Sequence, residues 1–360
     1  MSIFLLLSLP IPVFPVPVVC YYILNRPPVS EVPIDLCTHF ILINSAHVSE
    51  NGELEADIDD FEEFGRLRDR RDDLKLLVSI TSPNPSFSCL TSSESLMNNF
   101  ALDLLHEFRE NRLDGVDIDW EFPVWSRDAE PSDRAQFGEF LKILNYHLSA
   151  DGFLVSVAVS GPPTISKKAY DVEPLKKYAD MVQVMNYDFH VYNKYSNPFV
   201  GFNAPIHPMM AEISVLGKMN SEASMKTWLE MGLPKNITYF GVPTYARAFQ
   251  LLSRHLHKPY SPAVRDRPEL CNLDDICHLI NDSNYKKVWN RRALAPYLYG
   301  SDGLWISYEN RKSVRAKVEF AKSLQVAGIM VFSVGSDDGN GECGDGTWPL
   351  LREISKLANS

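Results

Sequence analysis

The sequence predicts an α/β fold, namely a (β/α)8 TIM barrel that carries a small α+β insertion domain. Eight short runs rich in β-branched and aromatic residues recur along the 360 residues, and amphipathic segments separate them. Strands that alternate with helical patterns are typical of parallel sheets built from βαβ units. One later gap between apolar runs is too long for a plain connection and predicts the insertion.

The expected barrel strands are the apolar runs, taken in chain order: Val18–Leu24, His39–Asn44, Lys75–Ile80, Gly115–Asp119, Phe153–Val159, Met181–Tyr187, Tyr239–Val242 and Gly328–Phe332. Amphipathic segments that predict helices include Ile58–Arg71, Glu94–Asn111, Ser132–Ser149 and Ser313–Leu324. A doubly wound open sheet is the structural alternative. No Gly-x-Gly-x-x-Gly sequence follows an early strand, which disfavours that alternative.

The long gap runs from Phe249 to about Tyr308 and contains Pro259, Pro262 and Pro268 together with two cysteines. A structureless loop of this length is uncommon in a compact protein. We therefore expect residues 249–308 to form the insertion domain, between the seventh strand and the seventh helix. Residues 18–248 and 309–360 would then form the barrel.

The first residues predict a secreted protein. Met1–Leu9 is apolar and four prolines follow it. A secretory signal normally begins with a basic region, and here no Lys or Arg precedes Arg26. We expect residues 1–17 to be a signal or leader segment and the protein to be extracellular. The apolar run is too short to cross a bilayer, so no membrane association is expected. A formal net charge of -11 argues against nucleic acid as a partner, because phosphate binding needs a basic surface.

The chain has six cysteines, an even number at wide spacing that fits disulfides but leaves fifteen pairings open. No Cys-x-x-Cys pair is present, which argues against a zinc site or a redox pair. Asn236 and Asn281 each begin an Asn-x-Ser/Thr triplet and are candidate glycosylation sites.

Three acids mark the candidate site. Asp117, Asp119 and Glu121 are spaced two apart, which on a strand puts them on one face, toward the barrel interior. The opposite face would pack under the helices and carries Val116, Ile118, Trp120 and Phe122. Burying unpaired carboxylates is costly, and their mutual repulsion should raise the pKa of at least one of them. A carboxyl that stays protonated near neutrality can act as a general acid.

Two other readings of these acids remain. An acidic strand exposed to solvent would have no role, but the strict alternation with bulky apolar residues disfavours it. A Mg²⁺ or Ca²⁺ site would suit carboxylate ligands. No His or Cys cluster accompanies the acids, so neither a metal nor a cofactor is expected.

The segment Asp114–Pro123 resembles the signature of family 18 glycoside hydrolases, the chitinases and chitinase-like lectins, and fits Asp-Gly-x-Asp-x-Asp-x-Glu throughout. Four other segments resemble family segments and follow in the same order: Val19–Tyr22, Leu36–His39, Met185–His190 and Gly241–Phe249. The insertion resembles the α+β domain of one branch of the family. The resemblance implies the disulfides Cys20–Cys37 and Cys277–Cys343. Cys89 and Cys271 would then form a third pair or remain free thiols.

The resemblance also implies a mechanism in which the substrate's own 2-acetamido oxygen attacks the anomeric carbon. Glu121 would protonate the leaving oxygen and then activate water. Asp119 would orient the acetamido group, and Asp117 would pair with Asp119, so that the two titrate together. Tyr187 would hold the acetamido carbonyl and Asp188 would contact the sugar.

Other residues are expected from the same resemblance to bind substrate or line its cleft, namely Tyr21 on the barrel floor, Met185, Tyr245, Arg247 and Phe332. Simple core packing is the alternative for each aromatic residue, and partnership with a carboxylate is the alternative for Arg247. Several tryptophans that chitin-cleaving members use are absent, because Asn25, Pro83 and Phe332 stand in their places. Of the tryptophans present, Trp120 should face outward and Trp125 could lie at the rim.

These observations predict a secreted, monomeric, endo-type chitinase that hydrolyses β-1,4 N-acetylglucosamine linkages with retention. Its partners would be chitin or N-acetylglucosamine oligosaccharides. The missing tryptophans should weaken its grip on long polymers. The alternative is a weakly active or inactive chitinase-like lectin or secreted signalling protein. Many such proteins have lost the acid at the position of Glu121, and its presence here favours catalysis.

Overall fold

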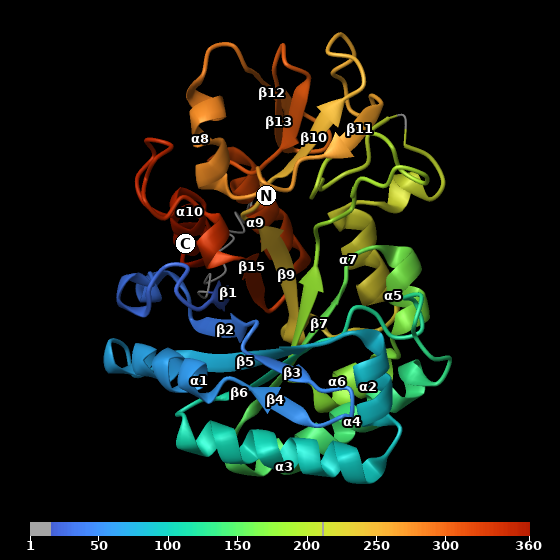
Figure 1. The fold of residues 1–360 in the computed structure, drawn as a ribbon, viewed down its shortest axis with the longest axis vertical. Helices are drawn as coiled ribbons and strands as arrows, with labels where there is room; N and C mark the ends of the chain where they lie inside the picture. The colour runs from blue at the N-terminus through green and yellow to red at the C-terminus, as the bar shows by residue number, and fades with distance from the viewer. Residues whose placement is uncertain (1–15, 211) are drawn as a thin grey trace, which may run out of the picture.

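The computed structural model describes residues 16–210 and 212–360, and its centre is a closed barrel of eight parallel strands (Figure 1). Around the barrel the order is β1-β15-β9-β8-β7-β6-β5-β2. The strands are β1 Val18–Ile23, β2 His39–Ile43, β5 Lys75–Thr81, β6 Gly115–Asp119, β7 Leu154–Ser160, β8 Met181–Met185, β9 Thr238–Pro243 and β15 Gly328–Phe332. The predicted (β/α)8 barrel is confirmed. The expected leader, residues 1–17, lies outside the described residues apart from its last two positions.

Helices cover the outside of the barrel, and most predicted bounds differ from the observed ones by one or two residues. They are α1 Ile58–Gly65, α2 Asn84–Thr91, α3 Glu94–Glu110, α4 Asp133–Leu148, α5 Pro163–Ala169, α6 Val172–Tyr178, α7 Ser221–Glu230, α9 Arg311–Leu324 and α10 Pro349–Ala358. The helix predicted to reach Arg71 ends at Gly65 instead, and a 3-10 turn follows. A Cβ on Gly65 would lie 2.5 Å from the carbonyl oxygen of Asn111, so only glycine allows this approach.

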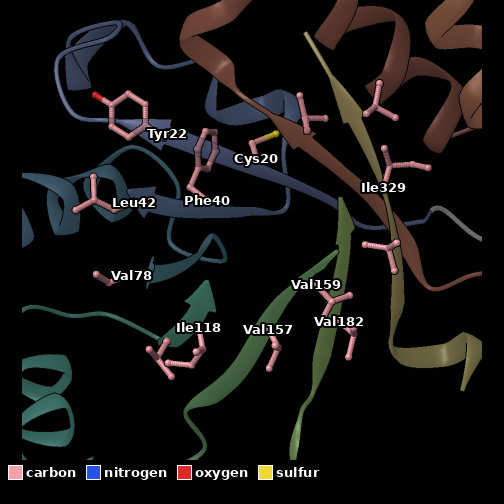
Figure 2. Packing of buried hydrophobic residues seen from close by; sticks show 14 of the residues in the cluster. Cys20, Tyr22, Phe40, Leu42, Val78, Ile118, Val157, Val159, Val182 and Ile329 are labelled. Carbon is pink, nitrogen blue, oxygen red and sulfur yellow. The ribbon is translucent and has the colours of Figure 1, made fainter. Parts of the chain in front are cut away.

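The main core lies between the strands and the helices. Alternate residues of neighbouring strands point outward together, because the parallel register places Cys20 beside Phe40 and Tyr22 beside Leu42 (Figure 2). The intervening positions point into the barrel, as Tyr21 does. This alternation directs every second side chain of β6 toward the barrel axis.

A second sheet lies between β9 and α9 in the sequence and forms a separate layer at the top of the view in Figure 1. Its strands pair antiparallel in the order β11-β10-β14-β13-β12. They are β10 Arg247–Leu251, β11 Ala263–Asp266, β12 Lys286–Asn290, β13 Ala295–Tyr299 and β14 Leu304–Ser307, with helix α8 Leu273–Asn281 beside them. Trp305 is fully buried in the core of this unit and stacks on Tyr297 with ring centroids 5.0 Å apart. A short hairpin, β3 Ala46–Val48 and β4 Leu54–Ala56, follows β2.

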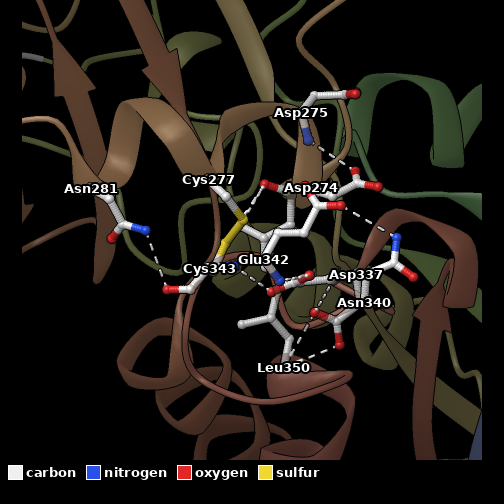
Figure 3. Close-up of a disulfide and its surroundings, with 11 residues drawn as sticks. Asp274, Asp275, Cys277, Asn281, Asp337, Asn340, Glu342, Cys343 and Leu350 are labelled. Atoms are coloured by element: carbon white, nitrogen blue, oxygen red, sulfur yellow. Dashed lines mark hydrogen bonds between the residues drawn. A yellow bond between two sulfur atoms is a disulfide. The ribbon is translucent and has the colours of Figure 1, made fainter.

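Both expected disulfides are formed. Cys20 on β1 joins Cys37 ahead of β2, and Cys277 on α8 joins Cys343 in the segment before α10 (Figure 3). The second bridge therefore ties the inserted unit to the C-terminal part of the barrel. Of the cysteines in the described ranges, Cys89 and Cys271 are the ones without a disulfide.

The two candidate glycosylation residues, Asn236 and Asn281, are exposed. Among the helices that the structure describes, none combines the length and apolar character needed to span a membrane.

Candidate active site

Asp117 lies under the site, fully buried on β6. Its carboxylate accepts hydrogen bonds from Tyr21 Oη at 2.8 Å, Ser79 Oγ at 3.0 Å and Ser156 Oγ at 2.7 Å. These donors come from β1, β5 and β7, so neighbouring strands of the barrel converge on one acid. Burial raises the pKa of Asp117 above its ordinary value, and the three hydrogen bonds partly oppose that rise.

Asp119 is the last residue of β6, and its Oδ1 is buried without a hydrogen-bond partner among the described residues. Burial raises the pKa of Asp119 well above its ordinary value, and the negative charges of Glu121 and Asp117 raise it further. Glu121 follows two residues later and reaches solvent. Withdrawal of its carboxyl from bulk water raises the pKa of Glu121, and the charge of Asp188 adds to the rise. The group therefore holds its proton more readily than a free glutamate.

The expected pairing of Asp117 with Asp119 takes a different form. Within the described part of the chain, the hydrogen bonds of Asp117 go to Tyr21, Ser79 and Ser156 rather than to Asp119. Asp117 acts on Asp119 through its charge. The reason is geometric: residues two apart on a strand project from the same face about 7 Å apart along the chain, while the flanking strands supply nearer donors.

A cavity of about 620 Å³ opens above these acids. The predicted residues that line it are Tyr21, Asp119, Glu121, Met185, Tyr187, Asp188, Tyr245, Arg247 and Phe332. Asp117 lies beneath this lining. The structure thus brings together side chains from β1, β6, β8, β15 and the segment after β9, at the end of the barrel where the strands finish.

Asp188 joins the barrel to the inserted sheet. Its Oδ1 accepts hydrogen bonds from Tyr245 Oη at 2.5 Å and Arg247 Nε at 2.7 Å. Asp188 has a φ of 55°, a left-handed conformation that aspartate adopts more readily than most residues. Asn203 supports this turn, because its Oδ1 accepts from the Asp188 backbone N–H at 3.0 Å. Arg247 therefore both lines the cleft and pairs with a carboxylate.

An aromatic wall faces the acids. The ring of Phe332 lies 5.5 Å from that of Tyr21, 5.8 Å from that of Tyr187 and 6.2 Å from that of Tyr245, measured between centroids. Burial is the main reason that the pKa of Tyr187 is raised well above its usual value, so its hydroxyl stays protonated and can donate. A protonated phenol beside a carboxyl pair can bind a carbonyl oxygen.

One residue has a second environment that the strand pattern does not predict. Phe122 packs partly against the helix-side core, as expected, but it also lines the cavity. The strand ends at Asp119, so its two-residue alternation does not extend to Phe122. Trp120, still close to the strand end, is buried outward as expected and stacks on Phe87 of α2 at 4.8 Å.

The sequence pattern also missed cavity residues that lie outside the barrel strands, namely Ile165 on α5 and the loop residues Tyr192, Arg267 and Cys271. Tyr192 Oη donates to the carbonyl oxygen of Val264 on β11 at 2.7 Å, which connects the loop after β8 to the inserted sheet. No periodicity marks such residues. Only the proximity of Tyr192 to the Met185–His190 segment could have indicated it.

Of the three substituted tryptophan positions, Phe332 lines the cavity and the other two lie apart from the acids. Asn25 is exposed in a turn after β1, and Pro83 caps the start of α2. Neither is among the described residues that line the cavity. Trp125 is 42% exposed and is a surface residue, with Lys168 Nζ 5.5 Å from its ring centroid. Its backbone N–H donates to the carbonyl oxygen of Phe122, which lines the cleft.

The family model described as glycosyl hydrolases family 18 matches residues 17–337. The chain belongs to this family. As a family 18 member it is a chitinase or a chitinase-like protein. Chitotriosidase-1 of Mus musculus is 26% identical over 361 residues, which cover 91% of this chain and 73% of that relative.

Solved structures of the family give the same fold. The group IV chitinase of Ostrinia furnacalis, in complex with allosamidin, superposes with a TM-score of 0.86 and 29% identity, covering 95% of this chain and 98% of that one. Human YKL-39, described as a pseudo-chitinase with retained chitooligosaccharide binding, superposes with a TM-score of 0.86 at 22% identity, covering 96% and 100%. The fold is therefore shared with a protein described as a pseudo-chitinase.

Proposed function

We propose that the protein is a secreted, monomeric chitinase that hydrolyses β-1,4 N-acetylglucosamine linkages by substrate-assisted catalysis with retention. One observation carries the proposal: Glu121, whose pKa is raised, shares a cavity with Asp119 and the Tyr187 hydroxyl. These are the groups needed to donate a proton and to hold an acetamido group. Family membership supports the hydrolase class.

In this mechanism Glu121 gives its proton to the glycosidic oxygen while the acetamido oxygen of the same sugar attacks the anomeric carbon. The bond to the leaving sugar breaks and an oxazolinium ring forms. Glu121, now a carboxylate, takes a proton from water, which opens the ring and regenerates the acid. Asp119 orients the acetamido N–H and stabilises the positive charge, and Tyr187 donates to the acetamido carbonyl.

Asp188, Tyr245 and Arg247 would bind sugar hydroxyls as one fixed unit, because their side chains are already hydrogen-bonded together. Phe332 would stack on the reacting sugar, with less area than a tryptophan offers. The absence of tryptophan at Asn25 and Pro83 supports short chito-oligosaccharides as better substrates than crystalline chitin. Endo-type cleavage remains part of the proposal.

A chitinase-like lectin is the second candidate, and the same substituted positions favour it. Loss of flat aromatic surface weakens the binding of long chains. A lectin of this family would bind oligosaccharides without turnover, and its fold would not differ.

The test is hydrolysis of fluorogenic chitobioside and chitotrioside by the purified protein and by Glu121→Gln. Glu139→Gln is the matched control, since Glu139 is an exposed acid on α4. We expect turnover by the native protein and the control, and a loss of at least about a thousandfold in Glu121→Gln. Allosamidin binding, followed by tryptophan fluorescence, checks that the cleft is intact. Native protein that binds but turns over no faster than Glu121→Gln would establish the lectin.

A further inference from the structure

The peptide that joins Glu121 to Phe122 has both of its polar groups held by side chains. The Glu121 carbonyl oxygen accepts from Ser126 Oγ at 3.1 Å and from Asn84 Nδ2 at 3.3 Å. The Phe122 N–H donates to the same Ser126 Oγ at 3.0 Å. A hydroxyl has one proton and two lone pairs, so Ser126 can make both bonds at once.

Asn84 has a second bond to the same short stretch of chain. Its Oδ1 accepts from the indole N–H of Trp120 at 2.6 Å. Asn84 is the first residue of α2 and is largely buried, and Phe87 of the same helix stacks on the Trp120 ring. Through Asn84, helix α2 is thus hydrogen-bonded both to the Trp120 side chain and to the Glu121 backbone.

These bonds lie where the regular sheet no longer supports the chain. Strand β6 ends at Asp119, so Glu121 is two residues beyond the last ladder position. Neither its carbonyl nor the next N–H has a partner in a neighbouring strand. Asn84 and Ser126 therefore hold the Glu121 carbonyl and the Phe122 N–H in place of the sheet.

We infer that Asn84 and Ser126 are positioning residues for the acid–base reaction, because they fix the backbone from which the Glu121 side chain extends. The inference rests on the proposed function. A general acid must lie within hydrogen-bond reach of the oxygen that it protonates, and a misplacement of about 1 Å can lower the rate by about a hundredfold. A loosened carboxyl would also be better hydrated, which lowers its pKa.

The kinetic test compares Asn84→Ala, Ser126→Ala and the double variant on the fluorogenic chitotrioside. We expect each single change to lower kcat about tenfold, with KM altered less than about twofold. The basic limb of the pH profile should move to lower pH. Because both side chains hold one carbonyl, the double variant should lose less than the product of the single losses. Ser126→Thr, which keeps the hydroxyl, should restore most of the rate.

Two matched controls remove similar bonds elsewhere. Ser92→Ala loses a hydroxyl bond to the Cys89 carbonyl, and Asn111→Ala loses an amide bond to the Glu107 carbonyl. Both should leave kcat and the pH profile unchanged. If Asn84→Ala and Ser126→Ala unfold at lower temperature but keep the kcat and pH profile of these controls, the inference is overturned.

A second measurement does not need turnover. Carbon-13 NMR of glutamate-labelled protein gives the pKa of Glu121, whose signal is assigned by its absence in Glu121→Gln. We expect a lower pKa in Asn84→Ala and in Ser126→Ala than in the native protein. An unchanged value would count against the inference. Should the native protein show no turnover, the proposed function fails, and this pKa comparison still decides whether the two residues position Glu121.

Discussion

Arg247 and Asp188 form an ion pair in the lining of the cleft, with Arg247 Nη2 2.5 Å from Asp188 Oδ1. The pair joins the first strand of the inserted sheet to the end of β8. Asp188 is also the charge that raises the pKa of Glu121 after burial. Substitutions on either side of this pair should therefore change the pH dependence of the proposed reaction.

Asp188→Asn should move the basic limb of the kcat/KM profile to lower pH. The reaction needs protonated Glu121, and removing a nearby negative charge lowers the pKa of that acid. A shift of about 0.5 pH units is expected, because the cleft is partly open to solvent. A profile measured between pH 4 and 9 checks this, and a shift to higher pH would contradict it.

Arg247→Met should move the same limb in the opposite direction. Without the guanidinium the charge of Asp188 is no longer compensated, so it raises the pKa of Glu121 further. KM should rise as well, because Asp188 and Tyr245 lose the group that holds them in place. Arg292→Met is the control, since Arg292 is an exposed arginine of the insertion that donates to the Pro208 carbonyl.

Tyr21→Phe should destabilise the protein by about 2 kcal/mol at pH 7, since it removes a hydrogen bond to a buried carboxylate. The folded-state pKa of Asp117 is already raised, and the loss of this bond raises it further. The penalty therefore grows as pH rises through that pKa and is smaller at pH 4, where more of Asp117 is protonated than at pH 7. Urea unfolding at the two pH values measures the difference.

Tyr22→Phe is the control for this prediction. Tyr22 is the next residue on β1, and its hydroxyl donates to the neutral carbonyl of Pro27 at 2.7 Å. Its loss should cost about 1 kcal/mol at both pH values. Equal pH dependence in the two variants would show that the Asp117 charge is not the cause.

The two disulfides should stabilise the fold unequally. Cys20 and Cys37 are separated by 17 residues and Cys277 and Cys343 by 66. On the chain-entropy model the bridges contribute about 3 and about 4 kcal/mol respectively, because the longer loop loses more freedom in the unfolded chain. Double alanine variants of each pair, compared by denaturant unfolding, test the order. A larger loss for the Cys20–Cys37 pair would contradict it.

Phe332→Trp should lower KM for chitotrioside about threefold, because the larger ring offers more stacking area beside Tyr21 and Tyr187. The open cavity next to Phe332 leaves room for the added ring. Phe199→Trp is the control, since Phe199 is 38% exposed and lies outside the cavity lining. An unchanged KM in Phe332→Trp would show that this wall does not stack on the substrate.

The barrel could be predicted from the sequence because the patterns that indicate its strands and helices are local. Apolar runs that alternate with amphipathic segments carry the eight strands, and Gly115–Asp119 and Gly328–Phe332 were predicted to the residue. The alternation also placed Asp117 inside the barrel and Trp120 outside. It did not predict that Phe122 also lines the cavity, because the chain has left the strand there and the two-residue alternation no longer applies.

The hydrogen-bond partners of the site could not be predicted in this way. Asp117 is bound by residues 96, 38 and 39 positions away in the sequence, and no local pattern connects them. The bonds of Ser126 and Asn84 to Glu121 depend on how a loop and a helix start meet. Family resemblance identified the disulfide pairs, which composition had left open.

Strand β10 begins at Arg247 in the cleft and continues into the inserted sheet, while the acids come from β6 on the far side of the barrel. In the proposed function, the proton donor and part of the glycan contacts are therefore encoded by separate stretches of the gene. Under the proposed function, substitutions in the insertion away from Arg247 can change how a glycan is held and leave the proton donor untouched.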